Sequence, residues 1–444
     1  MSTLNPLSAS TGGADTLAEK AAAYRKITVR LIPFLVFLFV LAWLDRVNVG
    51  FAKLQMLDDL KFSEAVYGLG AGIFFIGYFL FELPSNLLLT RVGARRTLAR
   101  ITILWGLTSI AMAFVKTPMQ FYTLRFLLGV FEAGFFPGVV LYITFWFPAE
   151  RRARINGLFM TSFAVAGIIG GPLAGFIMSV MNDVEGLEAW QWLFVVEGIP
   201  SVLAGFVVLA YLPERPVNAK WLTQRQRDLV TADVEADAAA PGKHASLRDS
   251  FNGKVWLCAA IYFCIVSGNA TIAFWSPSII KELGVQSPLY IGFVSAIPFI
   301  LGTIAMVWAG SNSDRTGERR MHCAIASILA SGGLAMTGYL LHSPIFALVA
   351  LSVAAIGILA AFPVFWAIPA AFLTGTAAAG GIAVINSVGN LAGFVSPYLM
   401  GWLRESTGNL AAGLYAVAGI QIMAAVLVIA FVKMDVRKPA PVPA

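Results

Sequence analysis

Charged residues are scarce in this sequence: Asp, Glu, Lys and Arg together make up 12% of its 444 residues. A soluble protein typically carries about 25%, because charges hydrate its surface. The scarcity excludes a soluble enzyme and a disordered protein. Apolar residues make up 58% of the chain and recur in runs of at least about 18 residues, each long enough to cross a bilayer as an α-helix. An outer-membrane barrel would instead show segments of about 10 residues in which apolar and polar residues alternate.

Cysteine and histidine are also rare, with three residues of each type. Three cysteines are too few for a disulfide framework, and no histidine in a predicted span lies near a cluster of Cys or Glu with metal-ligand spacing. We therefore expect no metal site. The sequence lacks the G-x-x-x-x-G-K-S/T motif that binds ATP phosphates, so an ATP-driven pump would need another subunit. No cofactor and no enzyme activity are expected.

The apolar runs predict an all-α polytopic membrane protein with twelve transmembrane helices in two six-helix bundles. A single long polar stretch between runs separates six helices from six. The predicted organisation is an N-terminal tail (1–28), a first bundle (29–211), a linker (212–253), a second bundle (254–432) and a C-terminal tail (433–444). The predicted helices span residues 29–52, 65–90, 97–116, 119–145, 154–180, 190–211, 254–280, 288–311, 321–341, 344–370, 378–403 and 409–432.

The basic residues predict the orientation of this bundle. If both tails and the linker lie in the cytoplasm, most of the 31 Lys and Arg residues also lie there. Such a bias is typical of cytoplasmic loops, and it accounts for the net charge of +7 without nucleic-acid binding. We therefore expect a bacterial inner (plasma) membrane protein with both termini in the cytoplasm, the lipid bilayer as its surroundings and a monomeric state.

An internal repeat indicates two related halves. The segment 90–96 (TRVGARR) recurs as 314–320 (DRTGERR), 224 residues later. The Gly and Pro residues of 167–175 recur in 393–401 at almost the same displacement. A duplication of six helices explains both matches, and repeats of this kind are typical of transporters whose binding site lies between the halves.

The repeated segment resembles a loop signature of the major facilitator superfamily. The second copy, GSNSDRTGERR (310–320), follows the signature, whereas the first copy, NLLLTRVGARR (86–96), has Asn86 in place of the usual Gly and Thr90 in place of the usual Asp. The resemblance implies a gating function for these loops. The residues that match are Arg91, Gly93, Arg95, Asp314, Arg315 and Gly317.

Further segments resemble the anion:cation symporter branch of that superfamily, which includes carriers of tartrate, sugar acids, phthalate and hydroxyphenylacetate. They are LDRVNVGFA (44–52), FELPSN (81–86), RFLLGVFEAGFFPG (125–138) and LPERP (212–216). The resemblance covers nearly the whole chain. It implies a carrier that works by alternating access, with a small organic anion as substrate and the proton as coupling ion.

Six ionisable residues lie inside the predicted spans, and all belong to the first half. Each costs at least a few kcal/mol in a bilayer, so each needs a partner or a function. Arg125 and Glu132 are seven residues apart and share one helix face, and Asp45 lies at a depth similar to that of Arg125. We therefore expect Arg125 to neutralise Asp45, with Glu132 deeper on the same path. The six residues are Asp45, Arg46, Glu82, Arg125, Glu132 and Glu197.

Asp45, Glu132 and Arg125 are the candidate proton-coupling residues. A buried carboxylate beside an arginine can exchange a proton near neutral pH. The alternative interpretation is a static charge cluster that holds two helices together. The resemblance implies the first, because sugar-acid carriers of this branch use the carboxylates that match Asp45 and Glu132 for protons. Glu82 and Glu197 are interpreted as structural.

Arg46 is the candidate anion-binding residue, because its guanidinium group presents a planar fork of donors that suits a carboxylate. The resemblance implies the same function for the matching arginine. Hydroxyl, amide and aromatic side chains at a similar depth are expected to complete the site, although Tyr78 equally suits helix packing. These residues are Trp43, Asn48 and Tyr78 in the first half and Asn269, Trp275, Thr374, Asn386 and Asn390 in the second.

The sequence thus predicts proton-coupled uptake of a small organic anion, with a hydroxy or sugar acid such as tartrate or an aldonate as the favoured substrate. An aromatic carboxylate is the alternative, since Trp275, Phe365 and Trp366 could stack on a ring. Antiport and uniport within the same fold stay open. A channel is disfavoured by the duplication and by the location of all the acids in one half, and a membrane-embedded enzyme by the absence of any catalytic constellation.

Overall fold

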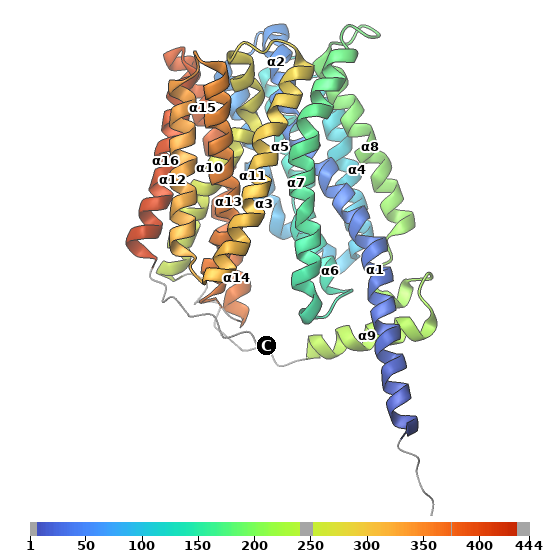
Figure 1. The fold of residues 1–444 in the computed structure, drawn as a ribbon. Coiled ribbons are helices and arrows are strands. Elements are labelled where there is room, and N and C mark those ends of the chain that lie inside the picture. The colour runs from blue at the N-terminus through green and yellow to red at the C-terminus, as the bar shows by residue number, and fades with distance from the viewer. Residues whose placement is uncertain (1–6, 240–251, 374, 433–444) are drawn as a thin grey trace, which may run out of the picture.

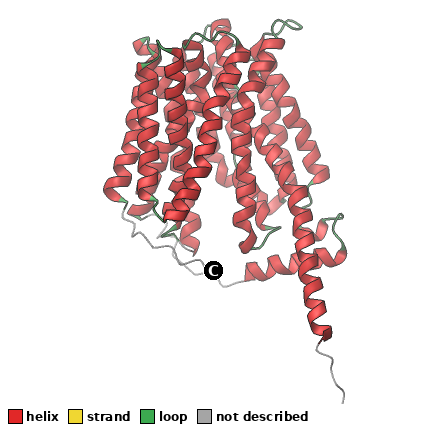
Figure 2. Ribbon diagram, viewed as in Figure 1, coloured by secondary structure: helices red, strands yellow, loops and turns green. Residues whose placement is uncertain are grey.

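The computed structural model describes residues 7–239, 252–373 and 375–432 as a bundle of long helices (Figure 1). No strand occurs within these described ranges (Figure 2), and the predicted all-α fold is confirmed. The helices are α1 (Leu7–Val47), α2 (Val49–Leu60), α3 (Glu64–Val92), α4 (Ala94–Met112), α5 (Pro118–Glu132), α6 (Phe135–Thr144), α7 (Ala149–Val180), α8 (Ala189–Tyr211), α9 (Gln224–Ala239), α10 (Gly253–Glu282), α11 (Pro288–Thr316), α12 (Arg320–Tyr339), α13 (Pro344–Ala370), α14 (Gly375–Asn390), α15 (Ala392–Thr407) and α16 (Leu410–Phe431).

Eleven helical stretches of the described chain are long and apolar enough to cross a membrane. Three of them consist of two helices with a short break between them: α1 with α2, α5 with α6, and α14 with α15. The predicted third span, 97–116, corresponds to α4, whose first two turns carry three arginines. Helix α4 packs against α5 and α8 inside the bundle. It is therefore counted with the eleven apolar stretches, and together they correspond to the twelve predicted helices.

Two groups of helices, α1–α8 and α10–α16, make up the bundle. In the first group α4 packs on α8 and α3 on α5, and in the second group α12 packs on α13 and α16. Two extensive helix pairs join the groups, α3 with α15 and α7 with α11. The groups correspond to the predicted bundles 29–211 and 254–432, whose boundaries stay predictions.

Helix α9 lies across one end of the bundle and beside α1, whose first turns extend beyond it (Figure 1). Three ion pairs hold it on the first group: Lys20 with Asp233 at 2.5 Å, Glu19 with Arg225 at 2.9 Å and Arg152 with Asp237 at 2.6 Å. Because α1 begins at Leu7, most of the predicted N-terminal tail is helical and continuous with the first span. We call this end the α9 end, and the opposite end, where α2 lies, the α2 end.

Glycines let the two groups approach closely. A Cβ atom on Gly68 would lie 2.5 Å from the carbonyl oxygen of Pro397 and 3.2 Å from the Cα of Gly401. In the α7–α11 pair, a Cβ atom on Gly292 would lie 3.2 Å from the Cα of Gly175. Gly292 follows Gly68 by 224 residues and Gly401 follows Gly175 by 226. The two contacts are therefore equivalent positions of the two halves, separated in the chain by the same distance as the repeated segments.

Replacement of Gly401 by alanine is expected to lower the thermal stability of the protein. The added Cβ would overlap the carbonyl oxygen of Glu64 and lie 3.1 Å from the Cα of Gly68, and overpacking of this kind costs about 1–3 kcal/mol. Thermal unfolding in detergent measures the loss. Gly419→Ala is the matched control, because its Cβ would have no neighbouring atom within 4 Å. Equal melting temperatures of the two variants would contradict the close contact.

Candidate functional site

An ion pair between Arg46 and Glu132 lies part-way along two spans, where helices break. Arg46 is in the last turn of α1, and Glu132 is the last residue of α5. The break after Glu132 involves Gly134, which has a φ of +85° before α6; glycine adopts this left-handed backbone without the steric cost of a Cβ. Both Nε and Nη2 of Arg46 donate hydrogen bonds to Oε1 of Glu132.

Aromatic rings surround the guanidinium group of this pair. Its central carbon lies 5.2 Å from the ring centre of Phe74, 5.6 Å from that of Tyr78 and 5.7 Å from that of Trp43. Cation–π contacts of this kind favour one orientation of the side chain. Glu132 is almost fully buried, whereas 18% of the Arg46 side chain is exposed. The structure therefore brings these predicted residues together and leaves part of the donor fork accessible to a second carboxylate.

Arg125 joins three helices through backbone oxygens. It is fully buried and donates to the carbonyl groups of Gly70 at 3.2 Å, Ala71 at 3.3 Å and Arg46 at 3.2 Å. Carbonyl groups next to a helix break lose their intrahelical partners, and Arg125 supplies a donor at such a break, near the end of α1. The predicted pairing of Arg125 with Asp45 is therefore wrong.

Asp45 accepts hydrogen bonds from neutral side chains of the first half. The donors are Trp105 Nε1 at 3.2 Å, Ser109 Oγ at 2.6 Å and Ser201 Oγ at 2.5 Å. Asp45 and Arg46 are consecutive in α1 and so point about 100° apart. Asp45 consequently faces α4 and α8, while Arg46 faces α3 and α5. Asp45 and Glu132, which were predicted to form one proton path, are thus separated: Asp45 lies on one face of α1, and Glu132 of α5 contacts another through Arg46.

The predicted residues of the second half lie mainly on α10 and α14. Asn269, Asn386 and Asn390 are partly exposed. Asn386 of α14 lies near Glu82 of α3, so Glu82 belongs to a contact between the halves. Thr374 lies outside the described residues.

Aromatic side chains connect the surroundings of Arg46 with the second half. Trp43 packs on Phe163 of α7 with 4.4 Å between ring centres, and Phe163 lies 6.5 Å from Phe362 of α13. Tyr262 lies 6.0 Å from Phe362 and 4.9 Å from Trp366. Tyr262 and Phe362 were not singled out from the sequence, because a single aromatic residue in an apolar span gives no functional signal.

Two predicted binding residues are buried in other surroundings. Trp275 is fully buried; its ring centre lies 5.4 Å from that of Tyr67 and 3.6 Å from Nζ of Lys53. Asn48 is 2% exposed and lies beside Glu197 within the first half. A substrate contact for either residue stays a prediction, which these positions do not favour.

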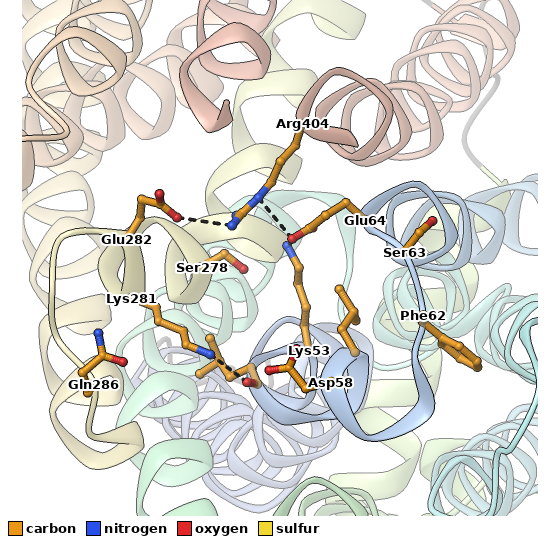
Figure 3. Close-up of a pocket in the computed structure, with 12 residues that line it drawn as sticks. Lys53, Asp58, Phe62, Ser63, Glu64, Ser278, Lys281, Glu282, Gln286 and Arg404 are labelled. Atoms are coloured by element: carbon orange, nitrogen blue, oxygen red, sulfur yellow. Dashed lines mark hydrogen bonds and ion pairs between the residues drawn. The ribbon is translucent and has the colours of Figure 1, made fainter. Parts of the chain in front are cut away.

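Charged side chains link the halves at the α2 end (Figure 3). Glu64, at the start of α3, pairs with Lys53 of α2 at 2.6 Å and with Arg404 of α15 at 3.1 Å. Arg404 also pairs with Glu282 of α10 at 3.2 Å. Lys281 donates to a carbonyl oxygen of α2 at 2.9 Å. We call Lys53, Glu64, Lys281, Glu282 and Arg404 the α2-end network.

The α2-end network lines a cavity of about 530 Å³ between the halves (Figure 3). Asp58 also lines it, so that three acidic and three basic side chains balance each other there. A balanced set of charges favours contact between the halves over the binding of an anion. Nothing in the sequence indicated this network, because the partners that meet in it are distant in the chain.

The first-half gating motif joins α3 to α4. Arg91 is in the last turn of α3. Gly93 has a φ of +99°, a backbone conformation that favours glycine because it has no Cβ, and the carboxyl group of Glu214 lies beside it. Arg95 Nε is 4.0 Å from Oε1 of Glu214. The motif therefore contacts the LPERP segment of its own half.

The second-half copy joins α11 to α12. Gly317, with a φ of +68°, caps α11, and Arg315 lies in the last turn of that helix. Asp314 pairs with Arg319 at 2.6 Å. These contacts of the two loops lie within the halves, and a gating function stays a prediction.

Comparisons with known proteins agree with this architecture. A family profile described as "Major Facilitator Superfamily" matches residues 35–397. A protein of Agrobacterium vitis named "Putative tartrate transporter" is 48% identical over 406 residues, covering 91% of this chain and 93% of that protein. A protein of Acinetobacter baumannii named "Quinolone resistance transporter" is 43% identical over 418 residues, covering 93% and 96%. The solved structure of the xylose transporter of E. coli in a partially occluded inward open conformation covers 92% of this chain and 100% of its own, with a TM-score of 0.73 and 14% identity, which is a likeness of fold.

Proposed function

Because this chain belongs to the Major Facilitator Superfamily, and is a transporter rather than an enzyme, we propose that it imports a small organic anion together with protons by alternating access. The observation that carries the proposal is the ion pair of Arg46 with Glu132. It joins the best anion-binding group of the chain to a buried carboxylate. The coupling ion is the proton, and no other cofactor takes part.

The ion pair provides a physical link between the proton and the anion. While Glu132 is charged, it occupies the donor fork of Arg46 and competes with the carboxylate of a substrate. Protonation of Glu132 removes this competitor, and the fork becomes free for the substrate. A proton therefore increases the affinity for the anion, and by linkage the bound anion increases the affinity for the proton to the same extent.

A hydroxy or sugar acid is the favoured substrate. Three partly exposed amide side chains of the second half, Asn269, Asn386 and Asn390, can bind hydroxyl groups, while Arg46 binds the carboxylate. The name of the Agrobacterium vitis relative supports the same class.

An aromatic carboxylate is the second candidate. In the second half, the ring of Tyr262 contacts those of Phe362 and Trp366, and these rings could stack on an aromatic substrate. The relative named for quinolone resistance is consistent with this class. Competition by tartrate, an aldonate and phthalate for uptake distinguishes the two candidates.

We further propose that the structure represents the state that is closed on the outside. In this state the α2 end faces the periplasm, the α9 end and both termini face the cytoplasm, and the chain lies in the bacterial inner membrane as a monomer. The α2-end network and the close glycine contacts hold the halves together at the outer side. Opening to the outside then requires the loss of the Glu64–Arg404 ion pair.

Glu64→Gln is expected to destabilise the outer contact, because a neutral amide replaces the carboxylate that Lys53 and Arg404 share. An unpaired buried charge costs several kcal/mol. A cysteine at Ser278, which lines the cavity, reports opening through its reaction with a membrane-impermeant maleimide, in a background without the three native cysteines. We expect labelling to become faster, on the order of tenfold.

Glu282→Gln is the matched control for this variant. Glu282 pairs with the same arginine, but within the second half, so its loss leaves the contact between the halves in place. Equal labelling rates in the two variants would contradict a gate built on Glu64.

Uptake into proteoliposomes tests the proposed function. Labelled tartrate should accumulate above its external concentration when the outside is acidic, and a protonophore should abolish the accumulation. Uptake that never exceeds equilibrium would indicate a uniporter or a channel, and acceleration by an alkaline outside would indicate antiport.

A further inference from the structure

A second pair of buried acids lies in the first half, apart from the Arg46–Glu132 pair. Glu197 of α8 is 4% exposed and precedes Ser201 by four residues, so both side chains are on one helix face. Ser201 donates to Asp45. Glu197 therefore lies one helical turn from the contact with Asp45, toward the α2 end.

The two carboxyl groups have different surroundings. Asp45 accepts three hydrogen bonds. Neither carboxyl oxygen of Glu197 has a hydrogen-bond partner within the described chain, and neither do the amide atoms of the adjacent Asn48, which is also buried. Two unpartnered polar side chains thus face each other beside Asp45.

No basic side chain of the described helices around α8 faces Glu197. Helix α1 presents Asp45, while the adjacent Arg46 is paired with Glu132. Helix α2 carries Lys53, which pairs with Glu64, and its two aspartates lie near its far end. The charged residues of α4 and α7 are confined to the first two turns of each helix, at the α9 end.

Electrostatics distinguishes the two acids. Two carboxylates without a cation cannot both be charged at low cost in a medium of low dielectric constant. Hydrogen-bond donors stabilise the charged form of a carboxylate. Asp45 accepts three hydrogen bonds, whereas Glu197 has only the amide of Asn48 beside it, so the proton shared by the pair resides on Glu197 in this state.

We propose that Glu197 is a second proton-carrying residue of the transport cycle, which exchanges its proton with Asp45. In this step the hydroxyl proton of the Glu197 carboxyl group moves to the Asp45 carboxylate, so that Glu197 becomes charged and Asp45 neutral. Glu197 is on the α2-end side of Asp45, as a residue that receives protons from outside must be. The inference rests on the proposed proton coupling and adds a second proton to the one that Glu132 carries.

The ratio of protons to anions tests this assignment. Reversal potentials in proteoliposomes with labelled tartrate provide this ratio for the wild type and for Glu197→Gln. Glu188→Gln is the control, because Glu188 is an exposed residue at the start of the same helix. We expect Glu197→Gln to move one proton fewer per anion while it keeps tartrate exchange and its melting temperature, because the amide has the shape of the protonated acid. The control should keep the wild-type ratio.

A wild-type ratio in Glu197→Gln would overturn the assignment and leave Glu197 with a structural function. If Glu197→Gln does not fold, the ratio of Asp45→Asn decides instead: one proton fewer supports the exchange, and an unchanged ratio overturns it. A wild-type ratio of zero would overturn the proposed proton coupling itself, and this assignment with it.

Discussion

Glu132→Gln is expected to remove the share of anion accumulation that the Glu132 proton drives, while tartrate exchange across the membrane continues. The amide retains the shape of the side chain but cannot carry a proton. It also removes the charged competitor from the donor fork of Arg46. Binding and the movement of the loaded carrier should therefore persist, while the energetic link between the anion and the Glu132 proton is lost.

The same variant is expected to change the pH dependence of binding. In the wild type, affinity for the anion should fall as pH rises, because charged Glu132 competes for Arg46, by at most about tenfold per pH unit for one linked proton. In Glu132→Gln the affinity should fall less steeply with pH than in the wild type. Equilibrium binding of labelled tartrate between about pH 5 and pH 8 measures both profiles.

Glu150→Gln is the control, because Glu150 is an exposed glutamate at the start of α7. It should keep the wild-type accumulation and pH profile. Accumulation at the wild-type level in Glu132→Gln would exclude Glu132 as a proton-carrying residue.

Arg46→Lys is expected to lower the affinity for the anion by about 10- to 100-fold. A charge-assisted hydrogen bond contributes about 1.5–3 kcal/mol, and lysine replaces the planar fork by a point charge. Lysine still neutralises Glu132, so the variant should fold with a melting temperature close to that of the wild type. Isothermal titration with tartrate measures the affinity.

Arg96→Lys, an exchange at an exposed position of α4, is the matched control and should bind tartrate as the wild type does. Unchanged affinity in Arg46→Lys would exclude Arg46 from the anion site. A large loss of stability with unchanged affinity would instead support the static charge cluster as the function of the Arg46–Glu132 pair.

The pairing of Asp45 with Arg125, which the sequence suggested, was wrong because side-chain direction cannot be read from the sequence. Asp45 and Arg125 were matched by depth along their helices, but depth does not fix the direction in which a side chain points. Helix α1 turns by about 100° per residue, so Asp45 and Arg46 face different neighbours. Trp105, Ser109 and Ser201 became partners of Asp45 only when α4 and α8 packed against α1.

The sequence by itself determined the class of the protein. Long apolar runs with few charges suit only a bilayer, a repeat of about half the chain predicts paired halves, and each charge inside a span demands a partner or a function. These arguments depend on local composition and spacing, and they led to the all-α fold and to Arg46 and Glu132. The matched motifs led to the family.

Tertiary structure decided which charges meet. Glu64 and Arg404 are 340 residues apart and form one ion pair, whereas Asp45 and Arg125, which seemed complementary in the sequence, do not. Hydrogen bonds and ion pairs act over a few ångströms, and positions along a helix fix neither its rotation nor its neighbours. For the same reason the isolation of Glu197 became visible only when the helices around α8 were in place.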